Sequence, residues 1–183
     1  MAVLKVAKLG NPVLRQLASP VSTENIRGNK NIQTLIDDMI DTMRAEEGVG
    51  LAAPQVCCSL QIVVLECVGN ERYPDRNEFQ LMVLINPAFT QRSEETVTGW
   101  EGCLSLPGLR GMVRRVKEVT VEAYNRLGEK ITIETGGFLA IALQHEIDHL
   151  YGTVYIDRMA DFSQLAFEDE FKAYWAKGEA VEI

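Results

Sequence analysis

The chain contains only two histidines, and they lie four residues apart in the segment QHEIDHL, at His145 and His149. Residues i and i+4 of a helix lie on the same face, so both imidazoles can bind one metal ion while Glu146 stands beside it. Neutral imidazoles on the apolar face of a helix need partners for their buried nitrogens, and a metal ion supplies them directly. The spacing therefore predicts a helix that carries a metal site.

A catalytic metal site of this kind needs three protein ligands and one open position, so the missing ligand decides the class of site. The extended pattern HExxHxxGxxH is matched as far as Gly152, but its last position is Tyr155, and the chain has no third histidine. A downstream carboxylate, Glu168 or Glu170, is a second candidate. Both belong to a run of acidic residues for which a solvated helix face is the expected environment.

Cys103 is the third candidate for this ligand. It lies in GWEGCLSLPG, where Gly102 lets the backbone approach a ligand closely, and Pro107 and Gly108 are expected to end the segment. A thiolate here would complete a set of one cysteine and two histidines with a vacant position. The remaining cysteines are expected to be small core residues, namely Cys57, Cys58 and Cys67.

The hydrophobic pattern predicts an α+β fold. Apolar residues recur at helical spacing from Asn31, with Gly48 as the expected stop, and further helices are expected at about 137–150 and 161–177. Segments rich in Val, Ile and Leu are expected to be strands, at Gln61–Cys67, Leu81–Asn86 and Val113–Tyr124. Because strands and helices do not alternate, we expect antiparallel or mixed sheets packed around a central helix that carries HExxH, plus an N-terminal and a C-terminal helix.

The chain shows no repeat, and its turn-rich stretches Ser22–Asn31 and Gly69–Glu78 are expected to be surface loops, so we expect one domain over residues 1–183. A net charge of −8 and a pI near 4.9 argue against a general affinity for nucleic acid or anionic membranes and favour a small neutral or peptidic substrate. The absence of a signal-like apolar run, and only four cysteines with two adjacent, predict a reduced, cytoplasmic protein.

A segment of small residues, EEGVGLAAPQV, covers positions 46 to 56. Its GxG lacks the preceding strand and the third glycine of a dinucleotide fingerprint, and Gly48 alone is an ordinary helix end. Gln55 follows this small-residue loop, and its amide N–H is suited to donating a hydrogen bond to an oxyanion.

Taken together, GVGLAAPQ at 48–55, EGCLS at 101–105 and QHEIDHL at 144–150 resemble the motifs of the peptide deformylase family. The resemblance extends over most of the chain between Leu4 and Arg158, including LINP at 84–87 and PGLRGMV at 107–113. It implies removal of the N-formyl group from the formylmethionine that begins new polypeptides. It also implies one divalent metal ion, with iron(II) as the usual native metal and zinc, nickel or cobalt as possible substitutes.

By position, the resemblance implies a role for each residue of the three motifs. The metal ligands would be Cys103, His145 and His149, Glu146 would be the general base and acid, and the oxyanion donors would be Gln55 and the backbone N–H of Leu104. A water molecule bound to a divalent metal loses a proton near neutral pH. Glu146 would accept that proton, the resulting hydroxide would attack the formyl carbon, and Glu146 would then protonate the departing amine.

The substrate pocket is expected to lie beside the first histidine. Residues at i−3, i−4 and i−7 from His145 are apolar, which favours either core packing or a pocket wall for a methionine side chain; they are Ala142, Ile141 and Phe138. Arg110 is expected either to bind peptide carbonyls or a carboxylate of the substrate, or to form a surface ion pair. The other residues expected to contact substrate are Val49, Gly50, Trp100, Glu101 and Gly102.

Two features depart from the family pattern. Trp100 and Arg114 stand where relatives vary, and the segment after Asp161 is acidic, whereas some relatives use a basic C-terminal helix to dock on the ribosome. The acidic segment argues against docking by that route. Two rival hypotheses are an HExxH metalloprotease with Glu168 or Glu170 as third ligand, and a binding protein with a structural metal or an inactive relative.

Overall fold

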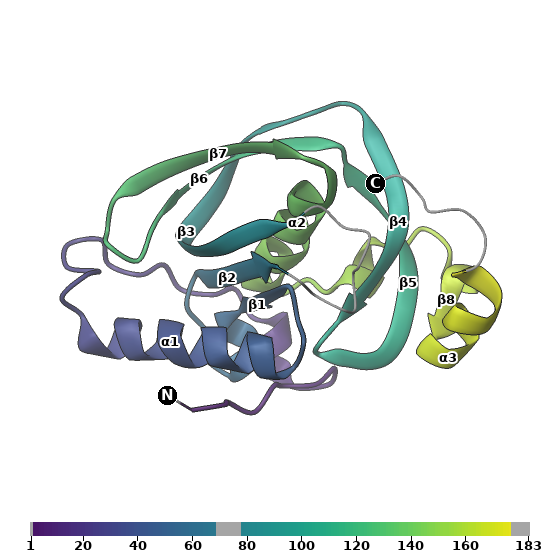
Figure 1. Cartoon of the computed structure of the whole chain (residues 1–183), viewed down its shortest axis with the longest axis horizontal. Helices are drawn as coiled ribbons and strands as arrows, with labels where there is room; N and C mark the ends of the chain where they lie inside the picture. The colour runs from purple at the N-terminus through teal and green to yellow at the C-terminus, as the bar shows by residue number, and fades with distance from the viewer. Residues whose placement is uncertain (1, 69–77, 177–183) are drawn as a thin grey trace.

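The computed structural model describes residues 2–68 and 78–176, and it is an α+β fold with two antiparallel sheets (Figure 1). The larger sheet has the strand order β1-β2-β3-β6-β7, with β1 at Gly50–Ala52, β2 at Ile62–Cys67, β3 at Phe79–Arg92, β6 at Glu118–Tyr124 and β7 at Lys130–Gly136. The smaller sheet has the order β4-β5-β8, with β4 at Thr96–Cys103, β5 at Leu106–Val116 and β8 at Leu165–Phe167.

Two longer helices and one short C-terminal helix complete the fold. Helix α1 covers Lys30–Ala45 and α2 covers Gly137–Leu150, whereas α3 covers Glu168–Glu170 and continues as a π-helical turn, Phe171–Trp175. Short 3₁₀ turns lie at Pro12–Arg15, Ala53–Val56, Tyr155–Arg158 and Phe162–Gln164. Within the described ranges, each helix is too short or too polar to cross a membrane.

The larger sheet separates α1 from α2, and strand β2 shows why. Successive residues of a strand point to opposite faces. Ile62 and Val64 pack in the same apolar cluster as the buried face of α1, whereas Val63 and Leu65 pack with Leu143 and other residues of α2. All of these β2 residues are fully buried, as expected of a strand with a helix on each face.

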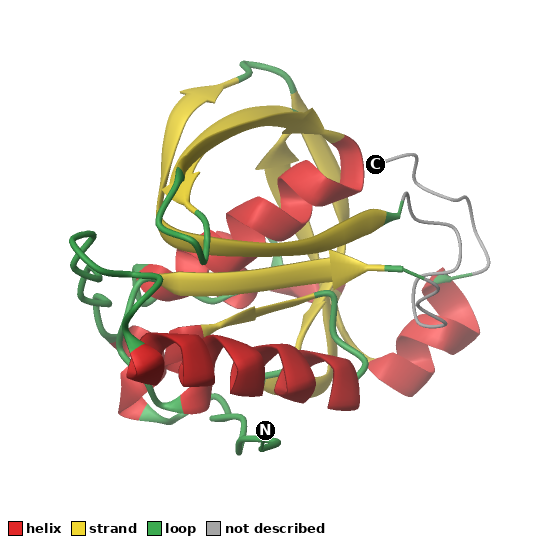
Figure 2. Ribbon diagram, turned by 60° about the vertical axis from the view of Figure 1, so that its left-hand side comes forward, coloured by secondary structure: helices red, strands yellow, loops and turns green. Residues whose placement is uncertain are grey.

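Helix α2 is buried on nearly all sides, because every residue from Ala140 to Leu150 is buried. It contacts β1, β2, β3, β6 and β7 of the larger sheet and β5 of the smaller one, and Figure 2 shows it enclosed by strands. A helix surrounded by protein needs apolar residues all round, which GFLAIAL supplies at its start. The polar residues that follow, including His145 and His149, are therefore withdrawn from water.

The N-terminal segment runs past three of the segments that the sequence singled out. Residues 2–18, the N-terminal strap, contain one 3₁₀ turn and no other helix or strand, and several of their backbone N–H groups find partners in these segments. Three backbone N–H groups donate to carbonyls, namely Ala7 to Gln55 (2.7 Å), Leu9 to Ser105 (2.8 Å) and Ala18 to Leu150 (2.8 Å). This N-terminal strap therefore connects the small-residue loop, the turn after Cys103 and the end of α2.

Several predicted boundaries need correction. Helix α1 begins one residue earlier than expected, with Asn29 as its N-cap, and the left-handed residue at its end is Glu47 (φ 54°) and not Gly48. The run Val113–Tyr124 is divided between β5 and β6, which belong to different sheets. Cys57 is exposed and not in the core, because it follows a 3₁₀ turn in left-handed conformation, whereas Cys67 is buried as predicted.

The predicted helix at 161–177 is wrong over its first half. Residues Phe162–Gln164 form a 3₁₀ turn, and Leu165–Phe167 extend the smaller sheet by pairing with β5. The α-helix begins only at Glu168, because Leu165–Phe167 find their backbone partners in the sheet. The predicted loop Gly69–Glu78 and the predicted helix end at Lys177 lie outside the described residues, apart from Glu78.

Gly152 provides a test of how closely the N-terminal strap approaches α2. Its φ is +69°, and a Cβ there would lie 2.7 Å from the backbone of Arg15. We expect Gly152→Ala to lower the free energy of unfolding by about 2–4 kcal/mol in a denaturant titration, because backbone strain and overpacking both oppose the folded state.

The matched control is Gly128→Ala. Gly128 also has a left-handed φ of +82°, but its added Cβ would meet nothing closer than 3.6 Å. The control should lose only about 1–2 kcal/mol, the cost of the left-handed conformation alone. Equal losses in the two variants would contradict the close approach of the strap.

Candidate active site and metal centre

Cys103 lies at the end of β4, where a tight hairpin turn holds it over α2. The register pairs Cys103 with Leu106, so Leu104 and Ser105 form the turn. The expected turn at Pro107 and Gly108 is therefore displaced by three residues, because both lie within β5. The hairpin end brings the thiol to the helix face that carries the two histidines.

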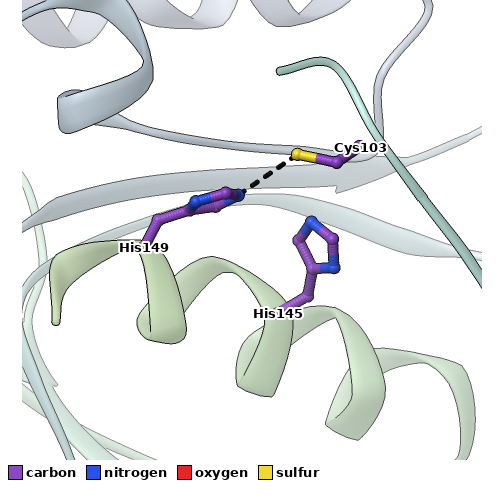
Figure 3. Close-up of side chains that lie close together, drawn as sticks. All are labelled: Cys103, His145 and His149. Atoms are coloured by element: carbon purple, nitrogen blue, oxygen red, sulfur yellow. Dashed lines mark hydrogen bonds between the residues drawn. The ribbon is translucent and has the colours of Figure 1, made fainter. Parts of the chain in front are cut away.

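The ligand atoms of Cys103, His145 and His149 all lie within 4.8 Å of one another, and all three residues are buried (Figure 3). The Sγ of Cys103 lies 3.3 Å from Nε2 of His149. Two ligands of a tetrahedral zinc-like ion, with bonds of about 2.1 and 2.3 Å, stand about 3.5 Å apart. The donor set therefore fits a divalent transition metal in both chemistry and spacing.

The two carboxylates proposed as alternative third ligands are not part of this group. Glu168 forms an ion pair with Arg110 at 3.0 Å and another with Lys172 at 3.5 Å. Tyr155, the last position of the extended zinc motif, stacks on His145 with 6.1 Å between ring centroids. Within residues 2–68 and 78–176, the geometry therefore favours Cys103 as the third ligand.

Glu101 orients the ring of His145. Its Oε2 lies 2.8 Å from Nδ1 of His145. Burial alone would raise the pKa of Glu101, but Arg115 and His145 outweigh it and lower the pKa to about 2. A carboxylate that remains charged accepts the Nδ1 proton, which leaves the lone pair of Nε2 free for a metal ion.

Arg115 connects Glu101 to the helix through an ion network. Its Nε and Nη2 donate to the two oxygens of Glu101 at 2.7 and 3.0 Å, and its Nη1 donates to Asp148 at 2.6 Å. Arg158 completes the network by donating to both oxygens of Asp148. Sequence reasoning missed Arg115 and Asp148, although a charged residue directly before His149 on a buried helix was a usable signal.

The two histidines differ in the direction in which the protein shifts their pKa values. Burial and the positive charges nearby lower the pKa of His149 well below its ordinary value, so this ring is neutral. For His145, burial also lowers the pKa, but hydrogen bonds to Cys103 and Glu101 raise it well above its ordinary value. A proton and a metal ion therefore compete at His145, as they do in metal sites generally.

Glu146 is buried against the backbone of β1. A Cβ on Gly50 would lie 2.4 Å from its Oε1, so only glycine leaves room for this carboxylate. Burial raises the pKa of Glu146 to about 7, while a charged His145 opposes the rise. Its Oε2 has no hydrogen-bond partner among the described residues. A carboxylate with this pKa and a free oxygen is suited to exchanging protons near neutral pH.

Gln55 is held rigidly beside the thiol of Cys103. Its Oε1 accepts from the backbone N–H of Ala52 at 2.8 Å, so its Nε2 must point the other way. That nitrogen donates to Oγ of Ser105 at 3.2 Å and lies 3.5 Å from Sγ of Cys103. Ser105, fully buried, is a positioning residue that sequence reasoning did not single out.

A cleft adjoins these groups, between α2 on one side and β4 with the loop before β1 on the other. Its apolar part includes Phe138, Ile141 and Ala142, the three helix residues expected to wall a pocket. The remaining predicted contact residues that line it are Val49, Gly50, Trp100, Glu101 and Gly102, together with Gln55 and Leu104. The predicted residues of three separate motifs therefore meet in one cleft.

Two predicted contact residues are bonded to protein partners, and one of them, Arg110, lies away from the cleft. Glu101 lines the cleft, and its carboxylate is bonded to Arg115 and His145, so its contact with substrate stays a prediction. Arg110 is not among the residues that line the cleft. It lies behind β4 in an ion pair with Glu168, as the alternative expected, but Arg110 is buried and Glu168 is half-buried, so the pair is not on the open surface.

A buried thiol and two imidazoles that could hold a metal ion, beside a buried carboxylate and an apolar cleft, are the arrangement expected of a hydrolase site. Known proteins agree with this class. The family described as polypeptide deformylase matches residues 3–164. Peptide deformylase 2 of Pseudomonas putida is 43% identical over 164 residues, which cover 90% of this chain and 92% of that protein.

Solved structures similar to this chain are also peptide deformylases. A class I type b peptide deformylase from Acinetobacter baumannii with Met-Ala-Ser bound is 40% identical, with a TM-score of 0.83 over 86% of this chain and 99% of that one. The structure of that enzyme with actinonin bound is 36% identical, with a TM-score of 0.79 over 87% of this chain and 100% of that one. The chain therefore belongs to the peptide deformylase family of enzymes, which remove N-formyl groups from nascent peptides.

The link between Glu101 and His145 can be tested through metal affinity. We expect Glu101→Gln to weaken metal binding about 10- to 100-fold, because a neutral amide orients the imidazole less firmly and leaves Arg115 without its charge partner. Competition with a chromophoric chelator would measure the affinity.

The control is Glu95→Gln, which removes an exposed carboxylate paired with Lys117 at 2.8 Å. The control should leave metal affinity unchanged, since surface pairs contribute little. An unchanged affinity in Glu101→Gln as well would show that the network does not support the metal ligand.

Proposed function

We propose that this enzyme removes the formyl group from N-terminal formylmethionine, using one divalent metal ion held by Cys103, His145 and His149. The observation that carries the proposal is the position of this ligand group next to Glu146 and an apolar cleft. Membership of the peptide deformylase family supports the reaction. The Met-Ala-Ser peptide in the Acinetobacter baumannii relative supports peptides as the substrate class.

Iron(II) is the metal that we propose for the native enzyme, with zinc, nickel or cobalt as possible substitutes. One thiolate and two imidazoles are compatible with all four metals, so the donor set alone does not choose between them. A divalent ion with three protein ligands would supply Lewis acidity, which lowers the pKa of water in its open position to about 7.

The protein's own groups would then carry the proton and stabilise the charge. Glu146 accepts a proton from the attacking water, whose oxygen bonds to the formyl carbon while the carbonyl oxygen becomes negative. The Nε2–H of Gln55 and the backbone N–H of Leu104 donate to this oxyanion, each contributing about 3 kcal/mol. Glu146 then passes its proton to the nitrogen, the C–N bond breaks, and formate and a free amine are released.

The arrangement of strands supports binding of an extended peptide. β1 ends the larger sheet and β4 ends the smaller one, and residues of both segments line the cleft. The terminal strand of a sheet offers unpaired N–H and C=O groups to an added strand. Phe138, Ile141 and Ala142 form the apolar wall for the unbranched methionine side chain.

New polypeptides begin with formylmethionine where they are made, so we propose the cytoplasm as the site of action. The C-terminal helix begins with three acidic residues, the half-buried Glu168 and the exposed Asp169 and Glu170. Because acidic groups repel the phosphates of ribosomal RNA, we propose no docking of this helix on the ribosome.

The sharpest test concerns Glu146. Glu146→Gln keeps the shape of the side chain and removes its basicity, while the three ligands are untouched. We expect kcat for formate release from a formyl-Met peptide to fall about 10²- to 10⁴-fold, with KM nearly unchanged and the metal retained. Protein purified without oxygen would be assayed, with metal analysis on the same sample.

Cys103→Ser serves as the contrasting variant. An alcohol is a far poorer ligand than a thiolate, so this variant should lose the metal as well as the activity. Two results would overturn the proposal: formate release at the parent rate by Glu146→Gln, or near-stoichiometric metal with normal activity in Cys103→Ser. An HExxH protease of the rival type would keep its metal in Cys103→Ser.

A further inference from the structure

The two faces of β4 are covered by different parts of the chain. Glu101 and Cys103 face α2, where they contact His145 and His149. Their neighbours in the strand point to the opposite face, because successive side chains alternate. On that outer face a Cβ added to Gly102 would lie 2.6 Å from the guanidinium of Arg110.

The C-terminal segment Leu165–Trp175 covers this outer face. Its first three residues, β8, pair with β5 in antiparallel register, at Leu109↔Phe167, Arg110↔Ala166 and Gly111↔Leu165. Glu168 then forms the ion pair with Arg110, whose side chain is only 7% exposed. The strand pairing and a partly buried ion pair therefore fix the segment behind the strand that carries Cys103, and Figure 1 shows β8 and α3 on this side of the smaller sheet.

Trp100 is the residue through which this segment reaches the cleft. Its ring lies 4.9 Å from that of Phe171 and 5.3 Å from that of Trp175, both at tilted angles. The π-helical turn, closed by the N–H of Ala176 donating to the carbonyl of Phe171 at 2.9 Å, presents both rings to Trp100. Trp100 itself lines the cleft, whereas Phe171 and Trp175 do not.

The place of Trp100 along β4 indicates which part of a substrate it meets. It precedes Cys103 by three residues, which corresponds to about 10 Å of strand. With the formyl carbon at the metal centre, an extended peptide reaches about 10 Å near its second and third residues. Trp100 therefore stands beyond the methionine pocket, beside the residues that follow the methionine.

We propose that the C-terminal segment Leu165–Trp175 forms part of the substrate cleft by holding Trp100, and that Trp100 selects peptides with apolar side chains after the first methionine. Trp100 is the specificity-determining residue, and Phe171 and Trp175 are positioning residues. The inference rests on the proposed deformylation, but it concerns a segment to which that reaction assigns no role.

The test compares two substrates in three alanine variants and in the conservative variant Trp175→Phe. Trp175→Ala and Phe171→Ala each remove one ring contact with Trp100, and Phe171→Ala also removes the ring that lies 5.9 Å from the guanidinium of Arg110. Tyr174→Ala removes a ring from the same turn that is 76% exposed. The substrates are a formyl-Met tripeptide with leucine at its second and third positions, and formylmethionine amide, which lacks these residues.

We expect KM for the tripeptide to rise about three- to tenfold in Trp175→Ala and in Phe171→Ala, the loss expected for one aromatic pair. Both kcat and the kinetics of formylmethionine amide should stay at the parent values, as should metal content. Tyr174→Ala should match the parent in every measurement, and Trp175→Phe should restore the KM of the tripeptide.

Fluorescence gives a second readout. Trp100 and Trp175 are the only tryptophans of the chain, so Trp175→Phe leaves Trp100 as the single reporter. Binding of the deformylated tripeptide should change the emission of this variant, whereas methionine amide should not. An unchanged emission with saturating tripeptide would contradict a contact between Trp100 and the peptide.

The outcomes separate the inference from the proposed function. If the parent enzyme released no formate from either substrate, the proposed function would fail. If the parent were active but Trp175→Ala and Phe171→Ala behaved like Tyr174→Ala, the inference alone would fail. Equal losses on both substrates would also overturn it, because they would show general damage to the fold and no selection beyond the methionine.

Discussion

The buried ion pair between Glu101 and Arg115 is the interaction on which the rest of the site depends. It joins β4 to β5, and through Asp148 and His145 it joins both strands to α2. Charges buried in protein are tolerated only when each is paired, and removing one partner costs about 3–5 kcal/mol. A shift of either strand relative to the helix would leave a charge unpaired, so the network aligns the thiol of Cys103 with the histidines.

Backbone contacts bring the remaining groups to the same place. The N-terminal strap bonds to the carbonyls of Gln55, Ser105 and Leu150, one in each of the three motif segments. Glycine then allows the closest approaches, since Gly50 leaves room for the carboxylate of Glu146. The site is thus assembled at the ends of elements from both sheets and α2, and the segment behind β4 extends it toward the peptide chain.

Local sequence patterns correctly predicted the helices and strands that are buried along most of their length. Helix α2 was predicted at its observed bounds because its apolar start and the histidine spacing agree, and β2 was predicted within one residue. Predictions failed where the partner of a segment lies far away in the sequence. Nothing local distinguishes Leu165–Phe167 from a helix, because its pairing with β5 is decided by a strand more than fifty residues earlier.

The sequence by itself determined the family and the helix that presents both histidines, and it supplied the donor types of the proposed metal site, because these depend on residue identity and short spacing. It left the third ligand open between Cys103 and two carboxylates when read without the family resemblance. The tertiary structure favoured Cys103, gave Glu101 the task of orienting His145, and buried Arg110 behind β4. These outcomes depend on tertiary packing. A charged side chain that is withdrawn from water must pair with an oppositely charged group within reach, and only the fold decides which group that is.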